Sequence, residues 1–286
     1  MMKGSDLVVY LNGEIVPHAE ARVPVDDRGF LFADGVYEVV RVYDGRPLLL
    51  DEHLERLGEG LAAIEIRLPR MDLAGIARRL IEQNDLGTAD ATIYVQVTRG
   101  VAPRKHAFPE AGCEPTVFIA ARAFKQHPDS YFDDGVAAIA VGDDRWARCD
   151  IKSVSLLPNV LANQRAHAAG AFEALYVRDG ILIEGSHSNL FGVLDGQLLT
   201  YPACNYILNG ITRRQVLSFA RELGIPGGEG LLPLARLAEI EELFLSGTTT
   251  EVMPIVRLDG RPIDDGEPGP ITQALQKAYR AALAAL

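Results

Sequence analysis

Hydrophobic and polar residues alternate over several short stretches of the chain, which is typical of half-buried β-strands. Many of these stretches come in pairs joined by Asn-Gly or Asp-Gly. These dipeptides favour tight hairpin turns because both residues tolerate a positive φ. The pattern predicts hairpin turns at 12–13, 44–45, 179–180, 195–196 and 259–260. Both halves of the chain are therefore expected to contain antiparallel sheets.

Longer periodic stretches and apolar runs lie between the hairpins. Helices are predicted at 51–66, 73–84, 158–169, 211–223 and along the last segment, and further strands at 91–99, 116–124 and 136–142. The polar stretch 125–134 contains Pro128 and predicts an interdomain linker. We therefore expect an α+β protein with a small N-terminal domain at 1–124 and a larger C-terminal domain at 135–286. Each domain is expected to be a mainly antiparallel sheet or barrel with helices.

Composition narrows the possible functions. The chain has 286 residues, 48% of them hydrophobic, so it can bury a substantial core. Its net charge of -11 argues against general nucleic-acid binding, and no apolar run approaches the roughly 20 residues that cross a membrane. The sequence lacks a signal-peptide pattern, and its three widely spaced cysteines predict a reduced, cytoplasmic setting. No metal-binding or Walker motif is present, so no metal site is expected.

Lysine is rare in this chain, which limits any chemistry that needs a primary amine. The five lysines are Lys3, Lys105, Lys125, Lys152 and Lys277. Lys152 stands apart because it lies in a short segment between a strand-rich region and a helix. Partial burial there would disfavour the ammonium and release a nucleophilic amine, as a Schiff-base lysine requires. Position alone leaves open a structural lysine paired with Asp150 or another carboxylate.

A series of short motifs extends along nearly the whole chain from about Val8. They are DRGF at 27–30, DGVYEVV at 34–40, EHLERL at 52–57, VTRG at 97–100, PRKH at 103–106, RW at 145–146, CDIKS at 149–153, EGS at 184–186, SN at 188–189, GITR at 210–213 and TT at 248–249. Each motif alone is weak. In this order and spacing the set resembles the fold-type IV (class IV) pyridoxal-phosphate-dependent enzymes, and among them most of all the D-amino acid (D-alanine) aminotransferases.

The resemblance implies a pyridoxal 5'-phosphate site. Lys152 would hold the cofactor as a Schiff base and move a proton between the substrate α-carbon and the cofactor. Glu184 would pair with the pyridine nitrogen and keep the ring a strong electron sink. The other implied cofactor-binding residues are Arg56, Ile211, Thr212, Thr248, Thr249, Ser188 and Leu208. Taken singly, such residues are also ordinary helix caps, turns or solvated positions.

The resemblance also implies a substrate site. Tyr37, Arg104 and His106 would hold the substrate carboxylate, since a planar guanidinium suits bidentate capture. The loop with Arg104 would reach into the active site of a partner subunit, which implies a homodimer with shared active sites. The same basic residues also fit a solvated loop. Two positions depart from the family pattern, because His187 and Gly247 stand where serine is expected.

The function implied is ping-pong transamination of D-amino acids, of the D-alanine or D-glutamate type, with 2-oxo acids such as 2-oxoglutarate or pyruvate. Amino acids and 2-oxo acids would be the small-molecule partners. The alternatives on the same fold are a branched-chain L-amino acid aminotransferase, an (R)-amine transaminase and an aminodeoxychorismate lyase. Arg104 and His106 follow the D-specific pattern. A different class, a catalytically silent binding protein, would be favoured by loss of Lys152 or Glu184, and both are present.

Overall fold

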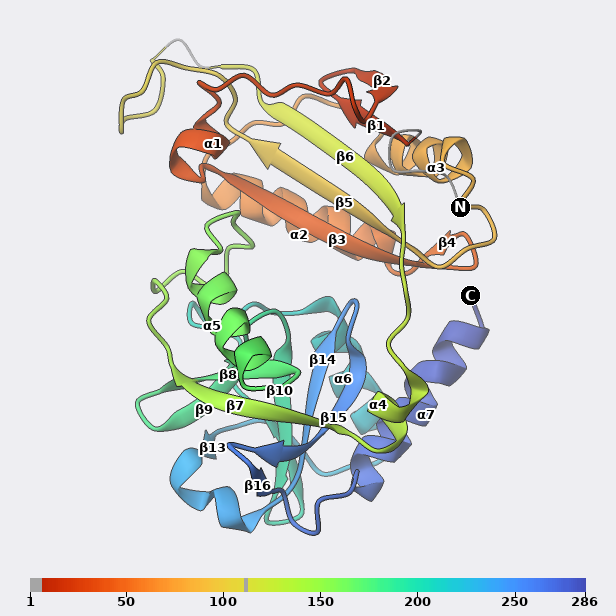
Figure 1. The fold of residues 1–286 in the computed structure, drawn as a ribbon, viewed down its shortest axis with the longest axis vertical. Helices are drawn as coiled ribbons and strands as arrows, with labels where there is room; N and C mark the ends of the chain where they lie inside the picture. Colours follow the sequence, from red (N-terminus) through yellow and green to blue (C-terminus); the bar gives the residue numbers. More distant parts are fainter. Residues whose placement is uncertain (1–6, 111–112) are drawn as a thin grey trace. The chain divides into compact units, whose positions relative to one another are not determined.

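The computed structural model describes residues 7–110 and 113–286, and Lys3 lies outside them. The chain divides into two compact units (Figure 1). The first unit runs to Gln126 and also includes Ile151–Ser155. The second unit comprises His127–Asp150 and Leu156–Leu286. The segment that contains Lys152 is thus packed with the first unit, although the sequence-based domain limits placed it in the second half of the chain.

A six-stranded antiparallel sheet, in the order β2-β1-β6-β5-β3-β4, forms the first unit. Helices α2 and α3 cover one face of it, and the apolar core lies between them and the sheet (Figure 1). The elements of this unit are β1 (Val8–Leu11), β2 (Glu14–Pro17), α1 (Arg28–Phe32), β3 (Gly35–Tyr43), β4 (Arg46–Pro47), α2 (Leu50–Ala63), α3 (Leu73–Gln83), β5 (Ala91–Thr98) and β6 (Thr116–Ala123).

Strand β3 carries functional candidates on both of its faces. Val36 and Val40 point into the core beneath the helices. Glu38 has the same parity along the strand and is also fully buried. Tyr37 has the opposite parity, and its ring stacks on Tyr94 with 5.7 Å between centroids. Alternation along one strand therefore separates Tyr37 from Glu38.

The second unit is a ten-stranded sheet in the order β12-β11-β10-β14-β15-β7-β8-β9-β13, with β16 paired to β15. Strand β9 also pairs with β10 through Asn189 and Glu184, which closes six of the strands into a barrel. The elements of this unit are α4 (Asp129–Asp133), β7 (Val136–Gly142), α5 (Leu157–Ala168), β8 (Glu173–Arg178), β9 (Ile181–Gly185), β10 (Asn189–Leu194), β11 (Gln197–Thr200), α6 (Ile211–Glu222), β12 (Gly227–Glu229), β13 (Leu232–Pro233), the 3₁₀ helix η1 (Leu234–Glu239), β14 (Ile240–Gly247), β15 (Glu251–Leu258), β16 (Arg261–Pro262) and α7 (Pro270–Ala284).

The α+β class and the hairpins agree with the sequence-based prediction. Asn12, Asp44, Asp179, Asp195 and Asp259 all have positive φ at the predicted turns. The predicted helices begin and end within a few residues of the observed ones. One difference lies in the stretch 125–134, predicted as a linker, which contains α4. Its Phe132 is buried in the core of the second unit, so an aromatic side chain fixes part of this polar stretch.

Candidate active site

The segment that contains Lys152 is fixed to the first unit through its backbone and its neighbour. The amide of Tyr37 donates to the Lys152 carbonyl at 3.0 Å, and the amide of Val154 donates to the Gly35 carbonyl at 3.1 Å. Ile151 is buried in the core of this unit. Burial of such a side chain stabilises by about 1.5–3 kcal/mol. The segment thus extends the edge of the sheet at the start of β3 and holds Lys152 there.

Lys152 and Tyr37 lie next to each other in the first unit. Lys152 Nζ lies 3.4 Å from the Tyr37 hydroxyl and 4.4 Å from the centre of its ring. Both side chains are half-buried. A tyrosine hydroxyl can donate or accept a hydrogen bond, so it can exchange a proton with an amine at this position. The pair is a candidate for proton transfer next to a bound substrate.

Arg56 belongs to a buried cluster that sequence reasoning missed. Its Nε and Nη2 donate to the two oxygens of Glu38 at 2.7 and 2.8 Å, and His53 Nδ1 lies 2.8 Å from the same carboxylate. Burial would raise the pKa of Glu38, but the hydrogen bonds from Arg56 and His53 outweigh it and lower the pKa to about 2. Burial also lowers the pKa of His53. The carboxylate is therefore ionised at neutral pH and the imidazole is neutral.

Arg104 and His106 lie on an exposed loop next to Phe32. The Arg104 guanidinium is 5.1 Å from the centre of the Phe32 ring, and the His106 ring is 5.5 Å from it. Arg28 fixes the loop, because its guanidinium donates to the Lys105 carbonyl at 2.6 Å. Two side chains that could bind a substrate carboxylate, Arg104 and His106, thus lie on one loop of the first unit. The role of Arg28 was not foreseen from the sequence.

Glu184 lies at the point where the barrel of the second unit closes. It is 5% exposed and pairs with Arg145 Nη1 at 2.5 Å. Its other oxygen has two longer contacts, from Leu208 N at 3.2 Å and Asn189 Nδ2 at 3.3 Å. Burial raises the pKa of Glu184 to about 7, although Arg145 opposes the shift. A carboxyl group with such a pKa can share a proton with a basic ring nitrogen.

Arg145 is the partner of Glu184 that the sequence did not single out as a site residue. Its guanidinium carbon lies 3.9 Å from the centre of the Tyr176 ring, and its Nε donates to Asp143 at 2.8 Å. Asp143 in turn accepts from Arg178 at 2.8 Å. Glu184 therefore ends a row of alternating charges.

The other predicted cofactor residues of the second unit gather around this closure. Ile211 and Thr212 form the first turn of α6, as predicted, and its N-cap Gly210 offers no side-chain cap. A Cβ at Gly210 would collide with Asn189 Oδ1, so the start of α6 passes directly by that residue. Such a helix start presents amide groups and a positive dipole end to an anion.

Thr248 and Thr249 form the turn between β14 and β15 and are half-buried. Asn189 pairs with Ser246 across the sheet, which brings this turn to the same end of the barrel. A Cβ at Gly247 would lie 3.7 Å from Ser188 Cβ. Within the described residues, Ser246 Oγ and Thr250 Oγ1 are buried without a hydrogen-bond partner. The turn therefore offers polar groups that a bound anion can satisfy.

Ser188 belongs to a hydrogen-bonded cluster around Glu173. Its hydroxyl donates to the fully buried Glu173 at 3.0 Å. Ser186 also donates to Glu173, and His187 Nδ1 lies 2.8 Å from it. Glu173 thus holds the three residues 186–188 in place. His187, one of the two departures from the family pattern, is 45% exposed at its side chain and lies at the edge of this cluster.

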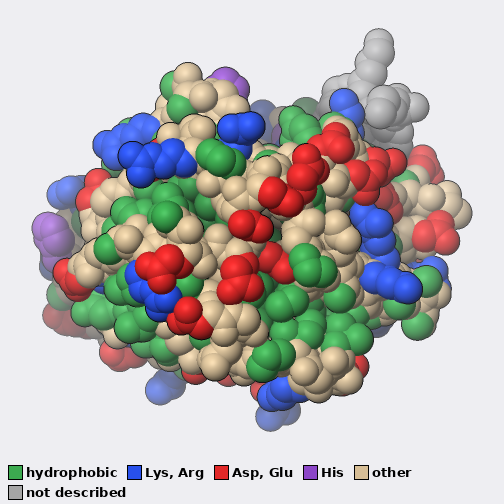
Figure 2. Space-filling model, turned by 90° about the horizontal axis from the view of Figure 1, so that it is seen from below, with side chains coloured by type: hydrophobic (Ala, Val, Ile, Leu, Met, Phe, Trp, Pro, Cys, Tyr) green, Lys and Arg blue, Asp and Glu red, His purple; other side chains and the backbone are tan. Residues whose placement is uncertain are grey.

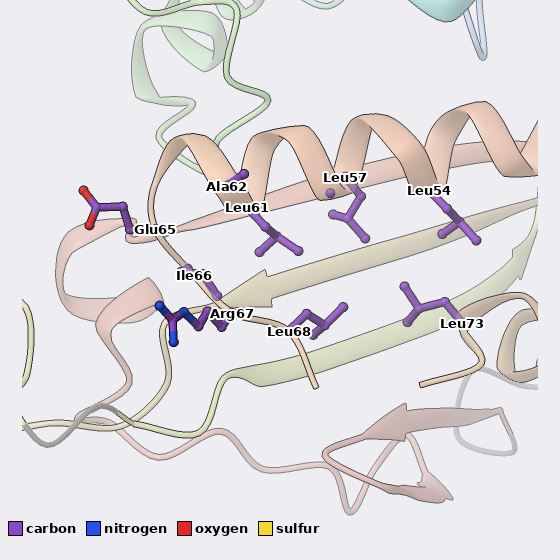
Figure 3. A pocket seen from close by; sticks show the side chains of 10 residues that line it. Leu54, Leu57, Leu61, Ala62, Glu65, Ile66, Arg67, Leu68 and Leu73 are labelled. Carbon is purple, nitrogen blue, oxygen red and sulfur yellow. The ribbon is translucent and has the colours of Figure 1, made fainter. Parts of the chain in front are cut away.

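An apolar pocket of about 550 Å³ lies in the first unit between α2 and the segment that follows it (Figure 3). Leu54, Leu57 and Leu61 of α2 face Leu68 and Leu73 across it, with Glu65 and Arg67 near one end. Its lining includes none of the residues predicted for the cofactor or substrate. The pocket is therefore separate from the candidate site.

Charged side chains of both signs are interspersed with apolar ones on the face drawn in Figure 2. Among residues 7–110 and 113–286, no cluster of three or more His, Cys, Asp or Glu residues could hold a metal ion. The helices in the same ranges are all too short or too polar to cross a membrane.

The first unit thus holds a lysine beside a tyrosine, and the second holds a buried glutamate where its barrel closes. The family profile described as amino-transferase class IV matches residues 35–258. The D-alanine aminotransferase of Staphylococcus aureus (strain N315) is 40% identical over 273 residues, which cover 95% of this chain and 96% of that protein. The D-alanine aminotransferase of Bacillus licheniformis is 42% identical over 275 residues, 95% of each protein.

Solved structures agree with this assignment. The branched-chain amino acid aminotransferase from Escherichia coli superimposes with a TM-score of 0.87 at 28% identity, covering 96% of this chain and 94% of that one. The chain belongs to the class IV aminotransferase family. The family predicted from the motifs and the α+β fold are thereby confirmed.

Proposed function

We propose that this aminotransferase acts on D-amino acids and uses pyridoxal 5'-phosphate bound at Lys152. The observation that carries the proposal is the fixed pair of Lys152 and Tyr37, with Nζ 3.4 Å from the hydroxyl. The similarity to D-alanine aminotransferases at 40% and 42% identity supports the choice of D-amino acids. Arg104 and His106, gathered on one loop around Phe32, support a carboxylate-binding role.

The residues present fit this cofactor. Glu184 has a pKa raised by burial to about 7, as suits a partner that shares a proton with a pyridine nitrogen. The first turn of α6 and the turn at Thr248 and Thr249 supply donors for a phosphate, and two buried hydroxyls at that turn have no partner within the described residues. When bound, the cofactor supplies an electron sink that stabilises negative charge on the substrate α-carbon.

The protein's own groups then orient the substrate and move the proton. Lys152 Nζ would take the proton from the substrate α-carbon and return it to the carbon on the other side of the substrate nitrogen, which is general acid/base catalysis by one amine. The Tyr37 hydroxyl holds Nζ on its side of the sheet. Arg104 of a partner subunit binds the substrate carboxylate, so the working form is a homodimer with shared active sites. We propose the cytoplasm as its location, since all three cysteines are free.

A half-reaction panel tests the proposal. D-alanine, added alone, should convert the bound cofactor to its amine form, and 2-oxoglutarate should restore the original absorbance. The matched L-alanine should leave the spectrum unchanged, and Lys152→Ala should abolish the exchange. An enzyme that responds to L-leucine or L-valine but not to D-alanine would instead act on branched-chain L-amino acids.

Arg104 is expected to bind the carboxylate and not the amine. Arg104→Ala should therefore lower kcat/KM for D-alanine by about 10²-fold, the effect of losing a bidentate charged contact, and leave simple (R)-amines within about threefold. Lys105→Ala, on the same exposed loop, is the control. Equal losses for the amino acid and the amine would show that Arg104 only shapes the loop.

A further inference from the structure

The cluster of Glu38, His53 and Arg56 does more than pair a buried charge. Glu38 belongs to β3 and is fully buried, while His53 and Arg56 belong to α2. The two helix residues are three positions apart, so they share one face of α2 and both reach the same carboxylate. A glutamate at a core-facing position of a strand is costly unless its oxygens are satisfied. Here both oxygens accept hydrogen bonds.

The geometry of these bonds fixes the guanidinium of Arg56. Nε binds one oxygen of Glu38 at 2.7 Å and Nη2 binds the other at 2.8 Å. Because the guanidinium is planar, two parallel hydrogen bonds define both its position and the direction of its plane. His53 in turn holds the carboxylate at 2.8 Å. A flexible arginine on a helix surface is thereby reduced to one orientation.

The charges within the cluster indicate that it orients the Arg56 guanidinium more than it attracts an anion by net charge. Glu38 is ionised and His53 is neutral at neutral pH, because their pKa values are both lowered. With the arginine the three side chains carry no net charge. Lys152 contributes to the lowered pKa of Glu38, so the cluster lies within electrostatic reach of the lysine. An anion near Arg56 would therefore be recognised mainly through directed N–H groups.

We propose that Glu38, supported by His53, is a positioning residue that orients the Arg56 guanidinium for the phosphate group of the cofactor. This inference rests on the proposed function, in which Arg56 binds that phosphate. It adds two residues, Glu38 and His53, that touch neither substrate nor cofactor and act through Arg56. The cluster would set how tightly a phosphorylated ligand is held, not whether Lys152 can react.

The test compares two ligands that differ only in the phosphate. Dissociation constants for pyridoxal 5'-phosphate and for pyridoxal are measured on the full chain freed of cofactor. Glu38→Gln should weaken binding of the phosphorylated ligand by about tenfold or more, the size of one lost charge-assisted hydrogen bond. Pyridoxal binding should change by less than about threefold. His53→Gln, which keeps a donor near the carboxylate, should give a smaller loss of the same kind.

Arg41 and Asp90 provide a matched control in the same unit. Arg41 is fully buried and pairs with Asp90 at 2.7 Å at the other end of β3. Asp90→Asn removes the half-exposed carboxylate partner of this buried arginine, and it should leave the ratio of the two dissociation constants unchanged. If Glu38→Gln fails to fold, His53→Gln decides the question by the same ratio.

Different results would overturn different claims. Equal weakening of both ligands in Glu38→Gln, or no weakening, overturns the positioning role while leaving Arg56 as a phosphate ligand. Arg56→Ala is the reference variant, and it should lose the phosphorylated ligand selectively. If Arg56→Ala does not, the phosphate assignment in the proposed function fails, and the positioning role fails with it.

Discussion

Glu38 in the first unit and Glu184 in the second are both buried and paired with an arginine, and the two carboxyl groups have pKa values shifted in opposite directions. In the first unit the pKa of Glu38 is lowered to about 2. In the second unit the pKa of Glu184 is raised to about 7. Both residues are at most 5% exposed, so burial alone does not distinguish the two pKa values. The difference lies in the hydrogen bonds that each carboxyl group receives.

Glu38 has three close contacts, all between 2.7 and 2.8 Å, and two come from one guanidinium. Glu184 has one close contact, from Arg145, and two others beyond 3.1 Å. Arg145 also binds Asp143, whose negative charge raises the pKa of Glu184 further. A fully satisfied carboxylate is suited to hold another side chain in place. A partly satisfied one can still share a proton with a ligand.

The two glutamates should differ most clearly in their effect on kcat, and the largest loss is expected from Glu184→Gln. Glutamine cannot keep a pyridine nitrogen protonated, so kcat should fall by about 10²-fold or more, the usual scale for losing a proton-transfer group. Glu38→Gln, measured at saturating cofactor, should lower kcat by less than about tenfold. Steady-state kinetics with D-alanine and 2-oxoglutarate provide the values. Similar kcat losses in the two variants would mean that the two glutamates do not have separate roles.

For stability at acid pH, Glu38→Gln should have a larger effect than Glu184→Gln. The pKa of Glu38 is lowered from 4.5 to about 2, so its ionised form stabilises the folded state above pH 4.5, and this contribution is lost as the pH falls toward 2. A shift of this size corresponds to about 3 kcal/mol. The lowered pKa of His53 acts in the same direction below pH 6.5, because the unfolded chain takes up the proton first.

Urea unfolding of the wild type and Glu38→Gln at a series of pH values checks this expectation. The wild type should lose stability steeply below pH 4.5, and the variant should be less stable at pH 7 and lose less on acidification. Glu184→Gln should retain the steep loss seen in the wild type. If Glu38→Gln still loses stability steeply below pH 4.5, other carboxylates must cause that loss.

Much of this arrangement follows from local sequence signals, and the rest depends on long-range pairing. The Asp-Gly turns and the start of α6 at Ile211 were predictable because turn and capping preferences act within a few residues. Arg145 was not predicted as the partner of Glu184, because the two are 39 positions apart and meet only in the folded second unit. The placement of residues 151–155 in the first unit was not predicted either, because it depends on their long-range pairing with β3.

Glu38 could have been found from the sequence. It stands between Val36 and Val40 on the core-facing side of a predicted strand, where a charged residue needs a partner. His53 and Arg56 lie at helical spacing in the next predicted helix and were the available donors. What the sequence could not supply was the packing of that helix against β3.

The most direct test is the protonation state of the two glutamates themselves. Infrared spectra of the cofactor-free protein, recorded across pH with isotope-labelled glutamate, follow the carboxyl stretch of each buried side chain. One buried carboxyl group should gain its proton near pH 7, and this signal should disappear in Glu184→Gln and remain in Glu38→Gln. A signal that survives in Glu184→Gln, or one that disappears in Glu38→Gln, would contradict the assignment of opposite roles.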